Sequence, residues 1–168
     1  SYPTFNPATL FENYQYLSTD AMRPMFNRAT QGIYNPGSTF KMCTAYAGLS
    51  SGIITAKDTV YCAGRYTKYI DAGYAPYCWA AGGHRENFNV VAALENSCNY
   101  FFYQLSDQMG IMRIATAAEQ LGLGGKTGIE IPEAEGIIAT PSYKENAIHE
   151  TWYAADNMLA AIGQGYNF

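Results

Sequence analysis

Apolar residues recur at the three- and four-residue spacing of helices over much of the chain. The expected helices span residues 39–49, 90–94, 100–109, 112–121 and 156–162. Most of these runs end at a glycine or a polar break, which commonly terminates a helix. Few segments alternate between apolar and polar residues as half-buried strands do. The pattern therefore predicts a chain that is mainly α-helical.

The first part of the chain carries a weaker pattern. Residues 1–16 hold two prolines and several turn-forming residues, and we expect them to be extended. Ser18 or Thr19 is expected to cap a short helix that contains Met22. Pro24 falls too deep for a clean first turn, so this helix is predicted to be short or to begin late.

Composition indicates a folded, globular chain. Of its 168 residues, 48% are apolar and only 14% are charged, so intrinsic disorder is not expected. A net charge of −4 gives no reason to expect a nucleic-acid partner, which requires clustered Lys and Arg. No apolar stretch approaches the ~18 residues of a membrane helix, and we expect no signal peptide among these residues. Because the chain opens without Met and stops just after a Gly-Gln-Gly turn, we expect it to be part of a longer protein.

Residues 34–41 read Tyr-Asn-Pro-Gly-Ser-Thr-Phe-Lys. Pro36 and Gly37 predict a turn that delivers Ser38 to the first turn of a helix. Ser38 and Lys41 are three residues apart, so they lie on one face of that helix. A hydroxyl beside an amine is a way to build an activated nucleophile. Alone, S-x-x-K is more often a serine cap followed by a solvated lysine.

A second polar motif, Ser97-Cys98-Asn99, falls at a break between two helical runs. Such a break can present a hydroxyl and an amide to a cleft while Cys98 points back into the core. By itself S-x-N is also an ordinary helix cap, so its value comes from the pairing with Ser38 and Lys41.

Together the motifs resemble those of penicillin-binding proteins, with similarity over nearly the whole of residues 1–168. These enzymes and the serine β-lactamases use S-x-x-K, S-x-N and K-T-G motifs around one site. Four segments come in the order seen in that family, at residues 36–41, 97–99, 125–132 and 161–165. The chain looks most like part of the transpeptidase domain of a class B, monofunctional enzyme. Cys62, Cys78 and the Gly-Gly-His84 segment are similar to clostridial and related Gram-positive examples. The resemblance implies the helical subdomain of an α/β fold, with most of the central sheet outside this chain.

The resemblance also implies a peptidoglycan D,D-transpeptidase. Ser38 would attack the carbonyl of a D-Ala-D-Ala stem peptide, and Lys41 would serve as its base. Ser97 would relay the proton toward the leaving amine, and Asn99 would hold the substrate amide. β-Lactams would acylate Ser38 and remain there. Two aromatic residues are candidates for the wall of the substrate cleft, Tyr34 and Trp152.

The sequence Lys126-Thr127-Gly128 spells the third motif but comes too early. In the family, a similar segment precedes the catalytic strand, and the true K-[ST]-G follows the Gly-Gln-Gly turn. We therefore expect Lys126 to be structural and the chain to be truncated before the third motif. The isolated chain should be poorly active because one wall of its cleft is missing.

Further expectations follow from the same resemblance. The parent protein would be membrane-anchored, act in a cell-wall synthesis complex, and face the extracytoplasmic side of the bacterial cell membrane. Its chemistry would require no cofactor. Two alternatives remain open, since a serine β-lactamase would share the same four residues, and a β-lactam sensor would keep the fold as a non-catalytic binding module.

Residues 55–88 show no sustained period and are rich in Gly, Pro and Tyr. An irregular stretch of this length usually needs a constraint. Cys62, Cys78 and His84 are spaced as Cys-x15-Cys-x5-His, which fits a structural Zn²⁺ site. A disulfide, which suits an extracytoplasmic domain, and two unpaired thiols are the other interpretations.

The fourth zinc ligand would be Asp71 or His149. Cys43 and Cys98 lie in apolar helical surroundings and are expected to be buried, inert thiols.

Overall fold

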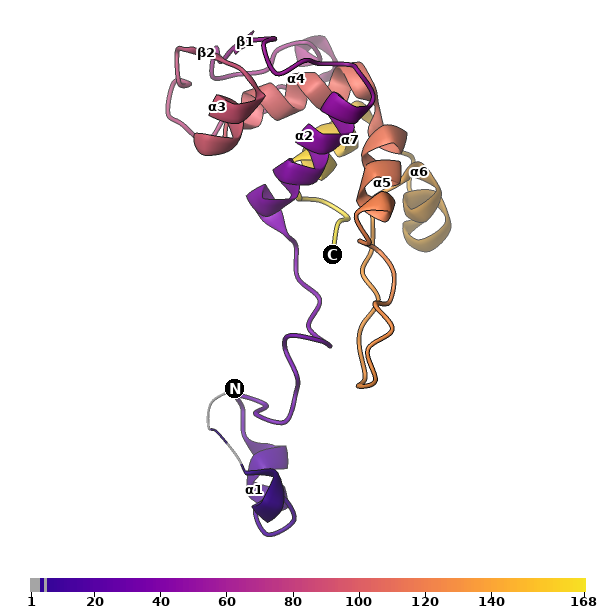
Figure 1. The fold of residues 1–168 in the computed structure, drawn as a ribbon. Coiled ribbons are helices and arrows are strands. Elements are labelled where there is room, and N and C mark those ends of the chain that lie inside the picture. Colours follow the sequence, from indigo (N-terminus) through magenta and orange to yellow (C-terminus); the bar gives the residue numbers. More distant parts are fainter. Residues whose placement is uncertain (1–3, 5) are drawn as a thin grey trace. The chain divides into compact units, whose positions relative to one another are not determined.

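The computed structural model describes residue 4 and residues 6–168, which fall into two compact units (Figure 1). Unit 1 comprises Ser1–Tyr34 and Lys126–Glu135, and unit 2 comprises Asn35–Gly125 and Gly136–Phe168. Unit 2 holds most of the internal contacts and contains both sequence motifs predicted to be catalytic.

Unit 1 contains the 3₁₀ turn η1 (Pro7–Thr9) and the helix α1 (Tyr14–Thr19). The prediction that Ser18 or Thr19 begins a helix was wrong, because these residues lie at the end of α1. Both hydroxyls donate to the carbonyl of Gln15 within that helix. Beyond Asp20 the chain forms turns.

The helices of unit 2 lie close to their predicted positions. They are α2 (Lys41–Ser50), α3 (Val90–Glu95), α4 (Asn99–Met109), α5 (Ile111–Gln120), α6 (Pro141–Tyr143) and α7 (Ala154–Ala161). Shorter turns are η2 (Gly37–Phe40), η3 (Ile70–Ala72) and the π-type η4 (Lys144–Ile148). Two short strands, β1 (Val60–Tyr61) and β2 (Asn87–Phe88), pair antiparallel. The predicted, mainly helical fold class is confirmed. In the described part of the chain, no helix is long and apolar enough to cross a bilayer.

Local signals explain several of these boundaries. The Asn89 side chain accepts a hydrogen bond from the Ala92 amide and caps α3. Gly110 separates α4 from α5 with a φ of 76° and a ψ of 159°, a backbone conformation open mainly to glycine.

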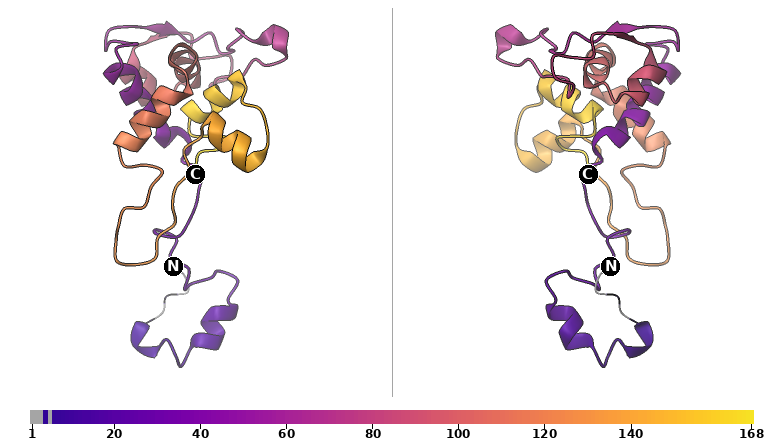
Figure 2. Two further views of the ribbon diagram at one scale, coloured as in Figure 1. Left: turned by 90° about the vertical axis from the view of Figure 1, so that its right-hand side faces the viewer. Right: turned by 90° about the vertical axis from the view of Figure 1, so that its left-hand side faces the viewer.

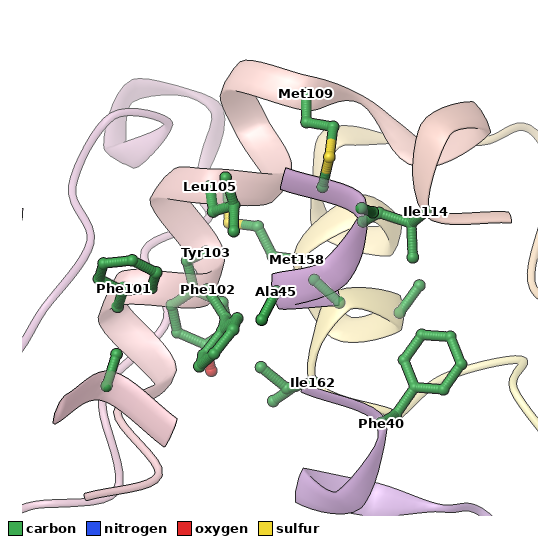
Figure 3. Packing of buried hydrophobic residues seen from close by; sticks show 14 of the residues in the cluster. Phe40, Ala45, Phe101, Phe102, Tyr103, Leu105, Met109, Ile114, Met158 and Ile162 are labelled. Carbon is green, nitrogen blue, oxygen red and sulfur yellow. The ribbon is translucent and has the colours of Figure 1, made fainter. Parts of the chain in front are cut away.

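The hydrophobic core of unit 2 is built around α2. This helix packs along α5, while α4 packs along α7 (Figure 1). Phe101, Phe102 and Leu105 of α4 are buried with Ile114 of α5 and Met158 of α7 (Figure 3). Since α2 sits against several helices at once, its first turn is held by the whole core.

Several contacts hold the irregular region at 55–88 to the helices of unit 2, beside which it lies in Figure 2. Its ends are joined by the β1–β2 pair, with Val60 opposite Phe88. The Asp107 carboxylate on α4 accepts hydrogen bonds from the hydroxyls of Tyr66 and Tyr69, and it pairs with Lys68. The constraint that the sequence called for is therefore partly supplied by α4.

Candidate active site

The turn that carries Ser38 is held in place by the Gly-Gln-Gly turn after α7. The Gly37 amide donates to the Gly163 carbonyl at 2.9 Å. The Asn35 side chain donates to the carbonyls of Gly165 at 3.2 Å and Asn167 at 2.8 Å. Ser38 itself is exposed within η2, directly before α2. The predicted nucleophile thus lies at the rigid start of a core helix with its side chain open to solvent.

Lys41 is buried, with 1% of its surface exposed, at the first position of α2. Its Nζ donates to the Ser97 carbonyl at 2.8 Å, to Ser97 Oγ at 3.0 Å, and to Asn99 Oδ1. The structure therefore brings together three of the four residues predicted to be catalytic. The fourth, Ser38, lies one turn earlier on the same face of the helix.

The surroundings of Lys41 favour its neutral form. Burial lowers the pKa of Lys41 to about 8, although the nearby Cys78 and Cys98 sulfurs act in the opposite direction. Among the described residues, no carboxylate forms an ion pair with this lysine. An amine with this pKa is a competent base near neutral pH.

Ser97 occupies a strained position between α3 and α4. Its φ of 48° is left-handed, which is uncommon for a residue with a Cβ and is often found at functional sites. The Ser97 amide donates to the Leu94 carbonyl, and the Cys98 amide donates to the Ala93 carbonyl. This tight turn ends α3 and aims the Ser97 hydroxyl at Lys41.

The two candidate cleft residues differ in their surroundings. Tyr34 ends the first of the two segments of unit 1 and is 60% exposed. Trp152 is half-buried against the core of unit 2, and its indole donates to Asn157 Oδ1 at 2.7 Å. That bond gives Trp152 a structural role, and a substrate contact stays a prediction for both residues.

The Lys126-Thr127-Gly128 segment forms a turn that binds a carboxylate from its own unit. Thr127 donates to Glu133 through its amide at 3.0 Å and through its hydroxyl at 2.6 Å. The Gly128 amide donates to the other Glu133 oxygen at 2.8 Å. These bonds agree with a structural role for the segment.

Three cysteines and a histidine gather beside Ser97. His84 Nδ1 lies 3.4 Å from Cys62 Sγ and 3.6 Å from Cys78 Sγ, and Cys78 Sγ lies 4.0 Å from Cys98 Sγ. All four ligand atoms are within 4.8 Å of one another. A tetrahedral Zn²⁺ with bonds of ~2.3 Å to sulfur and ~2.0 Å to nitrogen requires ligand separations of about 3.5–3.8 Å. The donor set therefore fits zinc in chemistry and in size.

The fourth member of this cluster is Cys98, which replaces the expected Asp71 or His149. Asp71 is exposed in η3, and His149 is exposed at the end of η4, so neither joins the other three residues. The predicted burial of Cys43 and Cys98 is confirmed, and Cys98 in addition lies within reach of the other three ligand atoms. All four cysteines are free thiols in the structure, so no disulfide is formed.

Cys78 is the thiol of the cluster that ionises most readily. A hydrogen bond from the Cys98 thiol lowers the pKa of Cys78 below its ordinary value, and the same contact raises the pKa of Cys98. A thiolate is the form of cysteine that binds a metal. Two glycines let the loop fold this tightly, since a Cβ on Gly83 would lie 2.4 Å from the Gly64 nitrogen.

Comparison with known proteins shows relatives across the whole chain. The peptidoglycan D,D-transpeptidase MrdA of Salmonella typhimurium is 35% identical over 178 aligned residues, covering 99% of this chain and 27% of that protein. Pseudomonas aeruginosa PBP2 in complex with WCK 5153 has a TM-score of 0.90 at 29% identity, covering 99% of this chain and 39% of that chain. PBP2 of Helicobacter pylori in complex with MreC has a TM-score of 0.89 at 27% identity, covering 99% and 32%. The expected likeness to clostridial and Gram-positive examples is not borne out by these relatives.

The family model for the penicillin-binding protein transpeptidase domain matches residues 1–167. The match spans both units and includes the Ser38, Lys41, Ser97 and Asn99 positions. The chain therefore belongs to the penicillin-binding protein transpeptidase family.

Proposed function

We propose that this chain supplies the nucleophile-bearing part of a peptidoglycan D,D-transpeptidase that works through a serine acyl-enzyme. The observation that carries the proposal is the buried Lys41 amine, which is bonded to Ser97 and Asn99 one helical turn from Ser38. The chain spans about a quarter of the length of MrdA, so the activity of the whole protein is part of the proposal.

The reaction begins with neutral Lys41. Its Nζ accepts the Ser38 hydroxyl proton as Ser38 Oγ bonds to the carbonyl carbon of the D-Ala-D-Ala peptide bond. The Ser38 amide supplies one donor to the resulting oxyanion, and such a donor is worth about 3–4 kcal/mol in comparable enzymes. As the C–N bond breaks, the proton passes from Lys41 through Ser97 to the leaving D-Ala amine. The acceptor amine of a second stem peptide then attacks the Ser38 ester, which forms the cross-link and restores the serine hydroxyl.

The same proposal names partners and location. Peptidoglycan stem peptides would be substrates, and β-lactams would acylate Ser38. Two structural neighbours, Helicobacter pylori PBP2 in complex with MreC and a member of a peptidoglycan synthase complex, support a role in a cell-wall synthesis assembly. The parent protein would then be membrane-anchored and act at the extracytoplasmic face of the bacterial membrane.

One experiment separates this function from the serine β-lactamase and sensor alternatives. The full-length protein is mixed with a fluorescent penicillin and, separately, with a D-Ala-D-Ala peptide and an acceptor amine. A transpeptidase gives a lasting penicillin adduct, D-Ala release and a cross-linked product. Rapid penicillin turnover would instead identify a β-lactamase, and an adduct without D-Ala release would identify a sensor.

We further propose that Cys62, Cys78, His84 and Cys98 hold a structural Zn²⁺. When bound, the ion would cross-link the irregular loop to the turn that carries Ser97 and Asn99. The chemistry at Ser38 requires no metal or other cofactor in this scheme.

Zinc analysis tests this site. The purified protein is expected to contain about one zinc per chain, and Cys98→Ser is expected to lose it because a closed structural site needs all four ligands. Cys43→Ser and Asp71→Asn are matched controls, since Cys43 is a buried thiol outside the cluster and Asp71 is exposed. Both should retain zinc. Zinc-free protein whose cysteines resist labelling, or zinc retained in Cys98→Ser, would refute the site.

A further inference from the structure

One residue of the irregular loop touches the backbone of the predicted catalytic turn. The Trp79 indole Nε1 donates to the Ser97 carbonyl at 2.9 Å and to the Asn96 carbonyl at 3.2 Å. Lys41 Nζ donates to the same Ser97 carbonyl at 2.8 Å. A single carbonyl oxygen therefore accepts bonds from the predicted base and from Trp79.

Burial does not account for the position of Trp79. Its side chain is 64% exposed, so the apolar ring contributes little to the core. The Trp79 ring also packs edge-on against His84, with 5.4 Å between the ring centroids. The directed contact of this side chain is thus the indole N–H on the turn between α3 and α4.

The carbonyl that Trp79 binds belongs to the strained residue of that turn. Ser97 holds a left-handed φ of 48°, and such conformations persist only where neighbouring contacts determine them. The same conformation brings Ser97 Oγ within 3.0 Å of Lys41 Nζ. Fixing the Ser97 carbonyl therefore also fixes the backbone from which its hydroxyl reaches Lys41.

We propose that Trp79 is a positioning residue for acylation: its indole N–H clamps the Ser97 carbonyl and keeps the Ser97 hydroxyl aimed at Lys41. The inference rests on the proposed function of Ser38 and Lys41. The preceding residue, Cys78, lies beside Cys98. The loop therefore contacts the turn on both sides of Ser97, at Asn96 through Trp79 and at Cys98 through Cys78. Trp79 acts through Ser97 and needs no contact with the substrate.

The test is Trp79→Phe in the full-length protein, which keeps an aromatic ring and removes the N–H donor. Stopped-flow acylation by a chromogenic β-lactam separates the acylation rate constant from the dissociation constant of the preceding complex. Losing one hydrogen bond that orients the proton relay is expected to slow acylation about tenfold. The dissociation constant and zinc content should not change. An unchanged rate constant, or a change confined to the dissociation constant, would overturn the proposal.

Tyr66→Phe is the matched control, because it removes a hydrogen bond that ties the same loop to Asp107 on α4. It should leave the acylation rate unchanged. Equal slowing in both variants would mean that general loosening of the loop is responsible, and this too would overturn the proposal. Absence of acylation in the unsubstituted protein would refute the function of Ser38 itself, whereas a normal rate in Trp79→Phe refutes only the positioning role.

Discussion

Acylation of Ser38 is expected to slow by about three orders of magnitude when Lys41 is replaced by methionine, because a positioned general base contributes 10²–10⁴-fold. Methionine is similar in length and apolar, so it can fill the buried site of Lys41 without leaving a cavity. The Lys41→Met variant should therefore fold normally but acylate slowly. Stopped-flow acylation and thermal unfolding of the same sample measure the two properties separately.

The other buried lysine of unit 2 provides the matched control. Lys144 Nζ lies 2.9 Å and 3.1 Å from the two oxygens of Asp156, which joins η4 to α7. Lys144→Met leaves that carboxylate without its partner, and breaking a buried pair costs about 3–5 kcal/mol. The free energy of unfolding of Lys144→Met should fall, while the folded protein should acylate at the unsubstituted rate. Acylation in Lys41→Met within about tenfold of the unsubstituted protein would show that Lys41 is not the base.

The pH dependence of acylation also tests whether Lys41 is the base. Burial lowers the pKa of Lys41 to about 8, and only the neutral amine can accept the Ser38 proton. Below that pKa the neutral fraction falls about tenfold per pH unit, so the rate should rise with pH and level off above about 8. Lys41→Met should lose this rising limb.

Gly163→Ala is expected to reduce acylation by at least about 100-fold, which is the usual cost of displacing a catalytic group by about 1 Å. A Cβ at this position would lie 2.1 Å from the Gly37 carbonyl oxygen and 2.7 Å from Phe40 Cβ. The first neighbour is backbone, so the turn that carries Ser38 must move. The acylation rate constant and the melting temperature should both fall.

Gly165→Ala separates steric displacement from backbone strain. Gly163 and Gly165 have nearly the same positive φ, 72° and 71°. A Cβ on Gly165 would meet only Leu159 Cβ, at an ordinary contact distance of 3.5 Å. The alanine at 165 should therefore cost about 1 kcal/mol of stability from strain and slow acylation far less. If the two variants slow acylation equally, the slowing does not come from displacement of the Ser38 turn by the new Cβ at residue 163.

Local patterns were sufficient to predict much of the fold. The helical periods and caps placed α2, α4 and α5 to within one or two residues, because Gly52 and Gly110 terminate helices through positive φ. The helix expected after Ser18 was wrong, since those hydroxyls bond backward to Gln15 and close α1 instead. Cap-forming residues do not by themselves distinguish the start of a helix from its end.

The site was harder to predict where it depends on contacts distant in sequence. Ser38 and Lys41 share one helical turn, so their spacing was informative. Cys98 was assigned to the core from its apolar neighbours, and only the fold brings it to Cys78 and His84. Trp79 gave no signal at all, because a hydrogen bond to a backbone carbonyl leaves no pattern in the sequence.

The central claim is that Ser38 is the acylated nucleophile. The most direct test is mass spectrometric mapping of the full-length protein after reaction with penicillin. We expect one covalent adduct per molecule, on the proteolytic peptide that contains Ser38, and no adduct in Ser38→Ala. An adduct on a different residue, or one that persists in Ser38→Ala, would contradict the account.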